Sequence, residues 1–450
     1  MEIFSLKKRH WSSSQIIIVG FGAVILLGSI LLMLPISSKN GVVTPFLDAL
    51  FTATSATCVT GLIVYDTASY WSGFGQAVLL LLIQIGGMGV VTIAVAAATV
   101  SGKKIGLMQR STMQEAIAAH KVGGIVRLTG FILKIILCTE LVGALLLLTV
   151  FGQEFPIARG IWYSIFHSVS AFCNAGFDLM GEGQPFSSLT GYSANGMVNL
   201  VIMSLIALGG IGFLTWEDIK DKGIHIKRYR LQSKVILITT AILIVVPALF
   251  FFLWEFSKPL WSGMTLWEKL WASFFQSVTP RTAGFNTVDL TRFSDSGQMV
   301  MILLMLIGGS PGSTAGGMKT TTVAVLLVTA LSVFKKKGEA ECMGRRIEGE
   351  TVENAATIFL MYITLFLAGG MLISCIEGLP LLTCLFESAS AIGTVGLTLG
   401  ITPQLSAASK IILAVWMYLG RVGGLTLVYA AFAGTQRNVS KLPKEKVTVG

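Results

Sequence analysis

The sequence predicts an all-helical integral membrane protein in which four parallel repeats surround one pseudo-fourfold axis. Two observations predict this fold class. Of the 450 residues, 53% are hydrophobic and only 12% are charged, whereas a soluble domain carries about 25% charged residues. In addition, a short apolar segment that ends in glycine recurs four times at nearly constant spacing, which is typical of structural repeats.

The recurring segment begins at a phenylalanine and reaches a glycine ten positions later. The four glycines are Gly61, Gly176, Gly284 and Gly396, at intervals of 115, 108 and 112 residues. A bulky Leu or Phe follows each of them, and a glycine-rich cluster begins 24 to 33 residues further on. These clusters begin at Gly86, Gly209, Gly308 and Gly420. Four matches in register, each with a trailing cluster, indicate repeated units.

Each repeat is expected to hold two membrane helices with a re-entrant half-helix between them. A membrane-spanning helix needs about 20 apolar residues. Apolar runs of that length predict spans at about 15–35, 72–99, 129–151, 194–215, 233–254, 298–331, 353–376 and 407–433. The runs that end at the repeated glycines are too short to span, so they must lie buried in protein or beside water. The predicted repeats are 1–100, 101–231, 232–338 and 339–450, the last with a cytoplasmic C-terminal tail.

The distribution of basic residues predicts the orientation of the chain. Of 33 Lys and Arg, 23 lie in the termini and in the loops between repeats, and only seven lie in the segments that hold the half-helices. The positive-inside rule places the first group, with both termini, in the cytoplasm. The half-helices then enter from outside. The net charge of +10 is thus explained by topology, and no nucleic-acid partner is expected. The basic loop ends are expected to be solvated, with contact to membrane lipid or to an acidic partner as the alternatives.

Four half-helices that enter from outside point their C-terminal ends at the membrane centre, where their dipoles favour a cation. The extended tripeptides that follow offer backbone carbonyls, which can replace the hydration shell of a potassium ion. Carbonyl oxygens alone would hold K⁺, and no resident metal or cofactor is expected. Packing glycines are the alternative, but packing does not explain the preceding half-helix. The candidate filter residues are Val59, Thr60, Gly61, Asn174, Ala175, Gly176, Thr282, Ala283, Gly284, Thr394, Val395 and Gly396.

Two motifs carry a family resemblance. Thr394-Val-Gly-Leu resembles the potassium-channel filter motif Thr-Val-Gly-Tyr-Gly without its last two residues. Val278-Thr-Pro-Arg-Thr-Ala-Gly-Phe-Asn286, together with the fourfold pattern, is similar to the Trk/Ktr/HKT superfamily of cation transporters, and within it to the Ktr-type membrane subunit of KtrB or KtrD kind. The resemblance covers essentially the whole chain.

The resemblance implies four repeats folded around one pseudo-fourfold pore that takes up K⁺ across a bacterial plasma membrane, with Na⁺ stimulation in some members. It implies a homodimer on a cytoplasmic ring of nucleotide-binding regulatory subunits of KtrA or KtrC type. It also implies that Ser in place of the first-repeat glycine accompanies Na⁺ preference. Because Gly61 occupies that position, K⁺ selectivity is expected.

The second span of the third repeat is interrupted by a run of glycines and a proline that cannot continue a helix. The break falls below the filter, and the resemblance implies an intramembrane gating loop, with a packing kink as the alternative. Arg421 lies in the middle of the last predicted span, where an unpaired charge is costly. We hypothesise that this Arg and the loop form the gate. The candidate gate residues are Gly308, Gly309, Ser310, Pro311, Gly312, Ser313, Thr314, Ala315, Gly316, Gly317, Lys319 and Arg421.

Two other functional classes are weaker. A secondary cation transporter with inverted repeats and a midplane substrate site expects an odd number of spans per repeat, whereas two are predicted here. An intramembrane enzyme lacks support, because the sequence places no Ser/His pair, paired Asp or metal-ligand cluster at membrane depth.

Four acidic residues follow the filters, either to concentrate cations at the outer mouth or as solvated loop carboxylates. They are Asp178, Glu182, Asp289 and Asp295.

Overall fold

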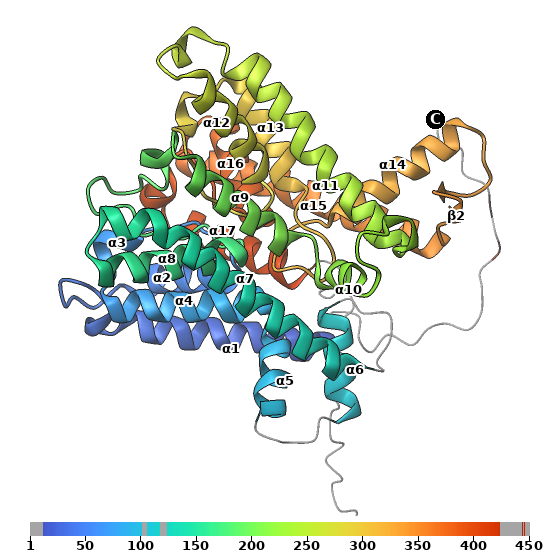
Figure 1. The fold of residues 1–450 in the computed structure, drawn as a ribbon, viewed down its shortest axis with the longest axis horizontal. Helices are drawn as coiled ribbons and strands as arrows, with labels where there is room; N and C mark the ends of the chain where they lie inside the picture. Colours follow the sequence, from blue (N-terminus) through green and yellow to red (C-terminus); the bar gives the residue numbers. More distant parts are fainter. Residues whose placement is uncertain (1–11, 101–105, 118–123, 424–442, 444, 446–450) are drawn as a thin grey trace, which may run out of the picture.

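The computed structural model describes residues 12–100, 106–117, 124–423, 443 and 445. The end of the last predicted span, 424–433, lies outside the described residues. So do ten of the basic residues that predict the orientation, namely Lys7, Lys8, Arg9, Lys103, Lys104, Lys121, Arg437, Lys441, Lys444 and Lys446. Apart from one small hairpin, the regular secondary structure of the described residues is helical (Figure 1).

The same order of elements occurs four times, and each time it begins with a long apolar helix. These helices are α1 (Ser13–Met33), α7 (Ile125–Glu154), α11 (Leu231–Phe250, continued by a π-helical turn at Phe251–Glu255) and α15 (Gly349–Glu377). All four are long and apolar enough to cross a membrane. They confirm the predicted spans at about 15–35, 129–151, 233–254 and 353–376.

A shorter helix follows each long one and packs against it. The short helices are α2 (Phe46–Thr57), α8 (Ile157–Phe172), α12 (Leu266–Val278) and α16 (Leu381–Gly393). A proline stands at the N-cap of α2, α8 and α16. In α12 the side chains of Thr265 and Glu268 form a capping box instead, which satisfies backbone N–H groups of the first turn. We refer to these four as the pore helices.

In the first three repeats the second long segment is broken at its glycine cluster, and in the fourth it is described as far as Gly423. Its parts are α4 (Gly73–Met88) with α5 (Val90–Val100), α9 (Gly196–Gly210) with α10 (Phe213–Lys222), α13 (Asp295–Leu306) with α14 (Thr320–Phe334), and α17 (Ala407–Val422). The prediction of unbroken spans at 72–99 and 194–215 is therefore wrong. Gly89 and Gly212 adopt φ of +83° and +87°, a conformation that ends a helix and favours glycine. The second break bends the chain by 95°.

The remaining elements are short. They are α3 (Thr67–Tyr70), α6 (Leu107–Ala116) and an antiparallel hairpin of β1 (Glu341–Cys342) and β2 (Arg345–Arg346). Single 3₁₀ turns occur at Pro35–Ser37, Thr190–Tyr192, Ile226–Arg228, Pro259–Trp261, Leu290–Arg292 and Thr402–Gln404. In Figure 1, α1 and α4 lie side by side, and α14 with the hairpin projects from one side.

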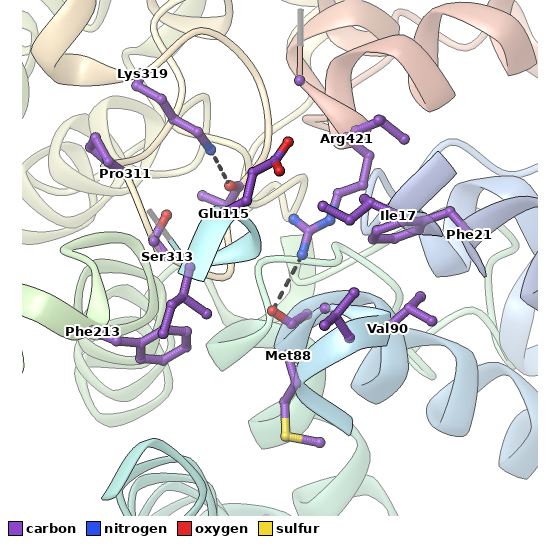
Figure 2. Close-up of a pocket in the computed structure, with 18 of the residues that line it drawn as sticks. Ile17, Phe21, Met88, Val90, Glu115, Phe213, Pro311, Ser313, Lys319 and Arg421 are labelled. Atoms are coloured by element: carbon purple, nitrogen blue, oxygen red, sulfur yellow. Dashed lines mark hydrogen bonds between the residues drawn. The ribbon is translucent and has the colours of Figure 1, made fainter. Parts of the chain in front are cut away.

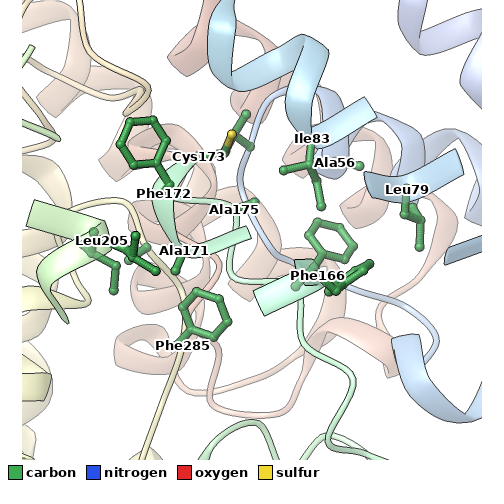
Figure 3. Close-up of a cluster of buried hydrophobic side chains, with 14 of the residues drawn as sticks. Ala56, Leu79, Ile83, Phe166, Ala171, Phe172, Cys173, Ala175, Leu205 and Phe285 are labelled. Atoms are coloured by element: carbon green, nitrogen blue, oxygen red, sulfur yellow. The ribbon is translucent and has the colours of Figure 1, made fainter. Parts of the chain in front are cut away.

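Buried aromatic side chains fill the space around the ends of the pore helices. Figure 3 shows Phe166, Phe172 and Phe285 around the segment that carries Ala175. All three phenylalanines are fully buried, and in a membrane protein such side chains stabilise the fold through van der Waals packing. Because Phe285 comes from the third repeat and the other two from the second, this packing fixes the two repeats against each other.

One ion pair joins the first repeat to the last. Lys410 on α17 donates to Asp48 on α2 at 2.9 Å, and the two side chains are only 11% and 14% exposed. We expect Lys410→Met to lower the free energy of unfolding by about 1–3 kcal/mol, because Asp48 would lose a partner in a poorly solvated place. Thermal unfolding of detergent-solubilised protein measures this. Lys335→Met, at an exposed lysine, serves as control, and equal transition temperatures for the two variants would contradict the prediction.

Candidate functional site

The four tripeptides that follow the pore helices share one unusual backbone shape. Their first residues adopt positive φ: +58° at Val59, +61° at Asn174, +69° at Thr282 and +52° at Thr394. Their glycines also have positive φ, between +70° and +99°. The expectation of an extended backbone is therefore wrong for the first and third positions. Positive φ is strained for a residue with a Cβ, so its fourfold occurrence identifies the tripeptides as equivalent.

The four glycines meet around a single axis. A Cβ added to Gly61 would lie 2.6 Å from the carbonyl oxygen of Ala175, and one added to Gly176 would lie 2.7 Å from that of Ala283. In the same way, a Cβ on Gly284 would overlap the carbonyl oxygen of Val395, and one on Gly396 that of Thr60. Each glycine thus faces a carbonyl of the next repeat, and the fourth faces the first. Segments more than 100 residues apart therefore form a closed ring.

Hydroxyl groups at the ends of the pore helices hold these segments in place. Ser55 and Ser390 each accept a hydrogen bond from the backbone N–H of the glycine six residues later, at 3.0 Å. Ser170 instead donates to the carbonyl of Phe177 at 2.7 Å, and Thr279 donates to that of Phe285 at 2.5 Å. None of these four residues is among the predicted site residues. The signal was present, because a serine stands six positions before the glycine in three of the four repeats.

The ring presents oxygen ligands and no acidic side chain. The carbonyls of Thr60, Ala175, Ala283 and Val395 face the glycines. The side-chain hydroxyls of Thr60 and Thr394 are buried without a hydrogen-bond partner among the described residues, although such a loss costs about 1–3 kcal/mol for an uncharged group. Together with four helix C-termini, which carry partial negative charge, this set of oxygens suits a dehydrated alkali cation.

The loop 308–317 lies against the break between α9 and α10 and against the last turn of α17. Ser310 N–H donates to the carbonyl of Gly210 at 2.9 Å, and Phe213 N–H donates to that of Gly312 at 2.7 Å. On the other side, Gly317 N–H donates to the carbonyl of Gly420 at 3.2 Å. The loop is closed at its base by a hydrogen bond from Gly308 N–H to the carbonyl of Met318, at 2.8 Å.

The same loop touches the fourth filter segment from below. A Cβ on Gly317 would lie 2.8 Å from the carbonyl oxygen of Gly393, and a Cβ on Gly316 would overlap the hydroxyl of Thr394. Only glycine allows so close an approach of two backbones. The structure therefore brings the predicted gate residues directly against the predicted filter.

Arg421 connects the loop to the first repeat. Its guanidinium donates to the carbonyls of Thr314 and Gly86, and to that of Gly87 at 3.3 Å. Lys319 stays within the loop and donates to the carbonyls of Ala315 and Gly316, at 2.8 and 3.4 Å. The loop thus contacts the second and fourth repeats directly, and Arg421 links it to the first. The two predicted cations therefore play different parts: one ties repeats together, and the other stiffens the loop.

A cavity of about 220 Å³ lies beside the loop, with Lys319 and Arg421 in its wall. Figure 2 shows Glu115 between these two cations, with Phe213 nearby. Glu115 comes from α6 and accepts a hydrogen bond from Ser14 at 2.5 Å. Glu115 is not among the predicted site residues, because it stands on a short helix between repeats and belongs to no motif. Among the described lining residues it is the one carboxylate.

The four acidic residues after the filters lie in different settings. Glu182 pairs with Lys39 at 3.3 Å and with Arg159 at 2.7 Å. Asp289 caps a 3₁₀ turn, and Asp295 is exposed in the first turn of α13. Asp178 alone follows a filter glycine by two residues. Burial, with a smaller contribution from the nearby charge of Asp66, raises the pKa of this carboxyl group to about 7.

Comparison with known proteins gives matches over nearly the whole chain. The profile of the family described as TrkH, cation transport protein, matches residues 6–441. The potassium/sodium uptake protein NtpJ of Enterococcus hirae is 40% identical, over 98% of each chain. The Ktr system potassium uptake protein B of Bacillus subtilis is 38% identical, over 99% of this chain and 98% of the relative.

The fold also matches a solved structure. The crystal structure of the potassium transporter TrkH from Vibrio parahaemolyticus superposes with a TM-score of 0.71 at 20% identity, over 95% of this chain and 86% of that one. At this identity the likeness concerns the fold alone.

Proposed function

Because the chain belongs to the TrkH family of cation transport proteins, we propose that it is the pore-forming membrane subunit of a bacterial K⁺ uptake system. The observation that carries this proposal is the closed ring, in which each filter glycine faces a carbonyl of the next repeat. A ring of carbonyls is the arrangement that replaces the water shell of K⁺. The relatives named as potassium uptake proteins B and D of the Ktr system, from Bacillus subtilis, support the same ion.

In this proposal K⁺ reaches the filter from outside and loses its water there. The twelve predicted filter residues supply the ring through their backbone, and the loop 308–317 with Arg421 closes the path below. An ion that leaves the filter meets a loop whose Gly316 lies against Thr394. The guanidinium of Arg421 adds a positive charge, which raises the barrier for a cation. Conduction then requires the loop to move away from its partners in the other three repeats.

The orientation and the partners belong to the same proposal. The basic termini and inter-repeat loops lie in the cytoplasm, and the protein sits in the plasma membrane as four repeats at 1–100, 101–231, 232–338 and 339–450. It forms a homodimer and binds a separate nucleotide-binding regulatory subunit. The excess of Lys and Arg in those loops supports the orientation, and the naming of relatives as members of a Ktr system supports a partnered assembly.

The proposal is tested by expression in a bacterium that lacks its own K⁺ uptake systems. We expect the chain, with its regulatory subunit, to restore growth at low external K⁺ and to catalyse K⁺ uptake in proteoliposomes. Na⁺ is varied in the same assay, because one relative is named as a potassium/sodium uptake protein. A properly inserted protein that moves neither ion would contradict the proposal.

The outer mouth is expected to respond to pH through Asp178. Since the pKa of this carboxyl is raised to about 7, the group is neutral below that pH and negative above it. A negative charge beside the filter attracts cations. The apparent K⁺ affinity should therefore fall as the external pH drops from 8 to 6, and Asp178→Asn should remove this part of the dependence. Uptake by the Asn variant measured at both pH values checks this, with the exposed Asp289→Asn as control, and an unchanged pH profile would contradict it.

A further inference from the structure

A buried carboxylate stands behind the fourth filter segment. Glu387 on α16 lies nine residues before Gly396, and its side chain is fully buried. Its Oε1 accepts a hydrogen bond from the hydroxyl of Thr402, and the hydroxyl of Thr398 also interacts with this carboxyl group. Oε2 makes no direct hydrogen bond to the described residues. Helices α13, α15 and α17 pack against α16, and none of their described charged residues forms an ion pair with Glu387. These residues are Asp295, Glu350, Glu353, Glu377, Lys410 and Arg421.

Glu387 is connected through Thr402 to the segment that follows the fourth filter glycine. The hydroxyl of Thr402 also lies 3.1 Å from that of Thr398, two residues after Gly396. On the other side of the filter segment, Ser390 Oγ accepts the N–H of Gly396 at 3.0 Å. One pore helix therefore holds the fourth segment at both ends, with Ser390 before the glycine ring and Glu387 after it.

Polar contacts of the same kind occur in the other repeats. The hydroxyl of Tyr65 donates to Asp48 at 2.9 Å in the first repeat. In the second, the N–H of Leu179 donates to Nε2 of His167 at 3.3 Å. In the third, Gln276 Nε2 lies 3.5 Å from the hydroxyl of Thr287. We call these contacts outer struts, because each ties a pore helix to residues that follow a filter glycine. Among them, the fourth is the one whose carboxyl group is fully buried.

We propose that Glu387 is a positioning residue that sets the selectivity of the filter through its strut to Thr402. This inference rests on the proposed function. Selection between K⁺ and Na⁺ depends on the placement of carbonyls around the ion, and such a constellation must be held to within about 0.5 Å. Without the contact to Glu387, Thr402 and the segment after Gly396 can shift. The carbonyl oxygens of the ring can then move closer together and coordinate the smaller Na⁺. Because an ionised carboxylate without a cationic partner is costly in a fully buried place, the strut requires a hydrogen-bond acceptor and not a negative charge.

A double-mutant cycle tests this inference by the ratio of K⁺ to Na⁺ uptake in proteoliposomes. Glu387→Ala and Thr402→Val remove the strut from its two ends, and each should lower the ratio about tenfold, as expected for one lost hydrogen bond to a buried group. The double variant should be no worse than either single variant, because both remove the same contact. Glu387→Gln keeps an acceptor at the same distance and should retain the wild-type ratio.

Glu377→Ala is the matched control. Glu377 is a carboxylate of the same repeat that accepts from the hydroxyls of Ser406 and Ser409, at 2.6 and 2.5 Å, and it should leave the ratio unchanged. Additive effects of the two strut variants, or wild-type selectivity in both, would overturn the inference. If Glu387→Ala does not fold, Thr402→Val with Glu387→Gln decides the matter. A wild-type protein that does not transport K⁺ would instead refute the proposed function, so the two failures are distinct.

Discussion

Gly396→Ala is expected to abolish K⁺ uptake. Gly396 has a φ of +92°, and its Cβ would overlap the carbonyl oxygen of Thr60 and lie 2.8 Å from the Cα of Gly61. The conformation alone costs an alanine about 1–3 kcal/mol. The overlap is worse, because the atoms in the way belong to the backbone of the neighbouring filter segment and cannot rotate aside. Either the ring opens or a carbonyl leaves its place, and we expect uptake to fall by at least about 100-fold.

Gly400→Ala separates the overlap from the backbone strain. Gly400 has a φ of +89°, nearly that of Gly396, but a Cβ added there would meet nothing within 4 Å. Both variants carry the same conformational penalty four residues apart, and only one of them blocks the ring. Uptake of K⁺ by equal amounts of the two purified proteins in liposomes is the measurement. Equal loss of uptake in both variants would contradict the assignment of Gly396 to the ring.

Arg421→Ala is expected to raise K⁺ flux in the closed state by about tenfold or more. The side chain holds the loop to the first repeat through the carbonyls of Thr314 and Gly86, and its charge opposes a cation below the filter. Its loss removes both the anchor and the repulsion. Arg421→Lys should restore the block only in part, because a single ammonium group cannot reproduce the planar fork of donors that reaches both carbonyls.

The measurement is K⁺ efflux from proteoliposomes without any regulatory subunit. A deletion of residues 310–315 should act in the same direction, since it removes the obstruction itself. Arg345→Ala, at an exposed arginine of the hairpin, controls for the loss of one positive charge. Gel filtration excludes unfolded variants. Wild-type flux in both the Arg421→Ala variant and the deletion variant would show that the loop is a packing kink.

The long helices and the pore helices were predictable because their sequence signals are local. Each pore helix is indicated by a Phe that is followed by a Gly ten residues later. The long helices are indicated by the length of their apolar runs alone. The breaks at Gly89 and Gly212 were missed, although the glycine clusters were recognised. A single glycine in an apolar run lowers helix stability only by about 1 kcal/mol, so the sequence does not distinguish a tolerated glycine from one that takes positive φ.

The contacts between repeats could not be predicted from the sequence, for a different reason. The ring pairs Gly396 with Thr60, and Arg421 reaches Gly86 across 335 residues. Such pairs follow from the closure of the ring and leave no periodic pattern. The same holds for Glu387, which the sequence shows as one glutamate in an apolar helix. Its proposed role depends on the contact with Thr402, which is a property of the fold.

The central claim is that the four tripeptides bind one dehydrated K⁺ between them. Anomalous scattering from crystals grown with Tl⁺, which substitutes for K⁺, tests this claim most directly. The account predicts a peak on the axis of the ring, within ligand distance of the carbonyls of Thr60, Ala175, Ala283 and Val395. A transport-competent protein whose Tl⁺ peaks all lie elsewhere, or which shows none, would contradict it.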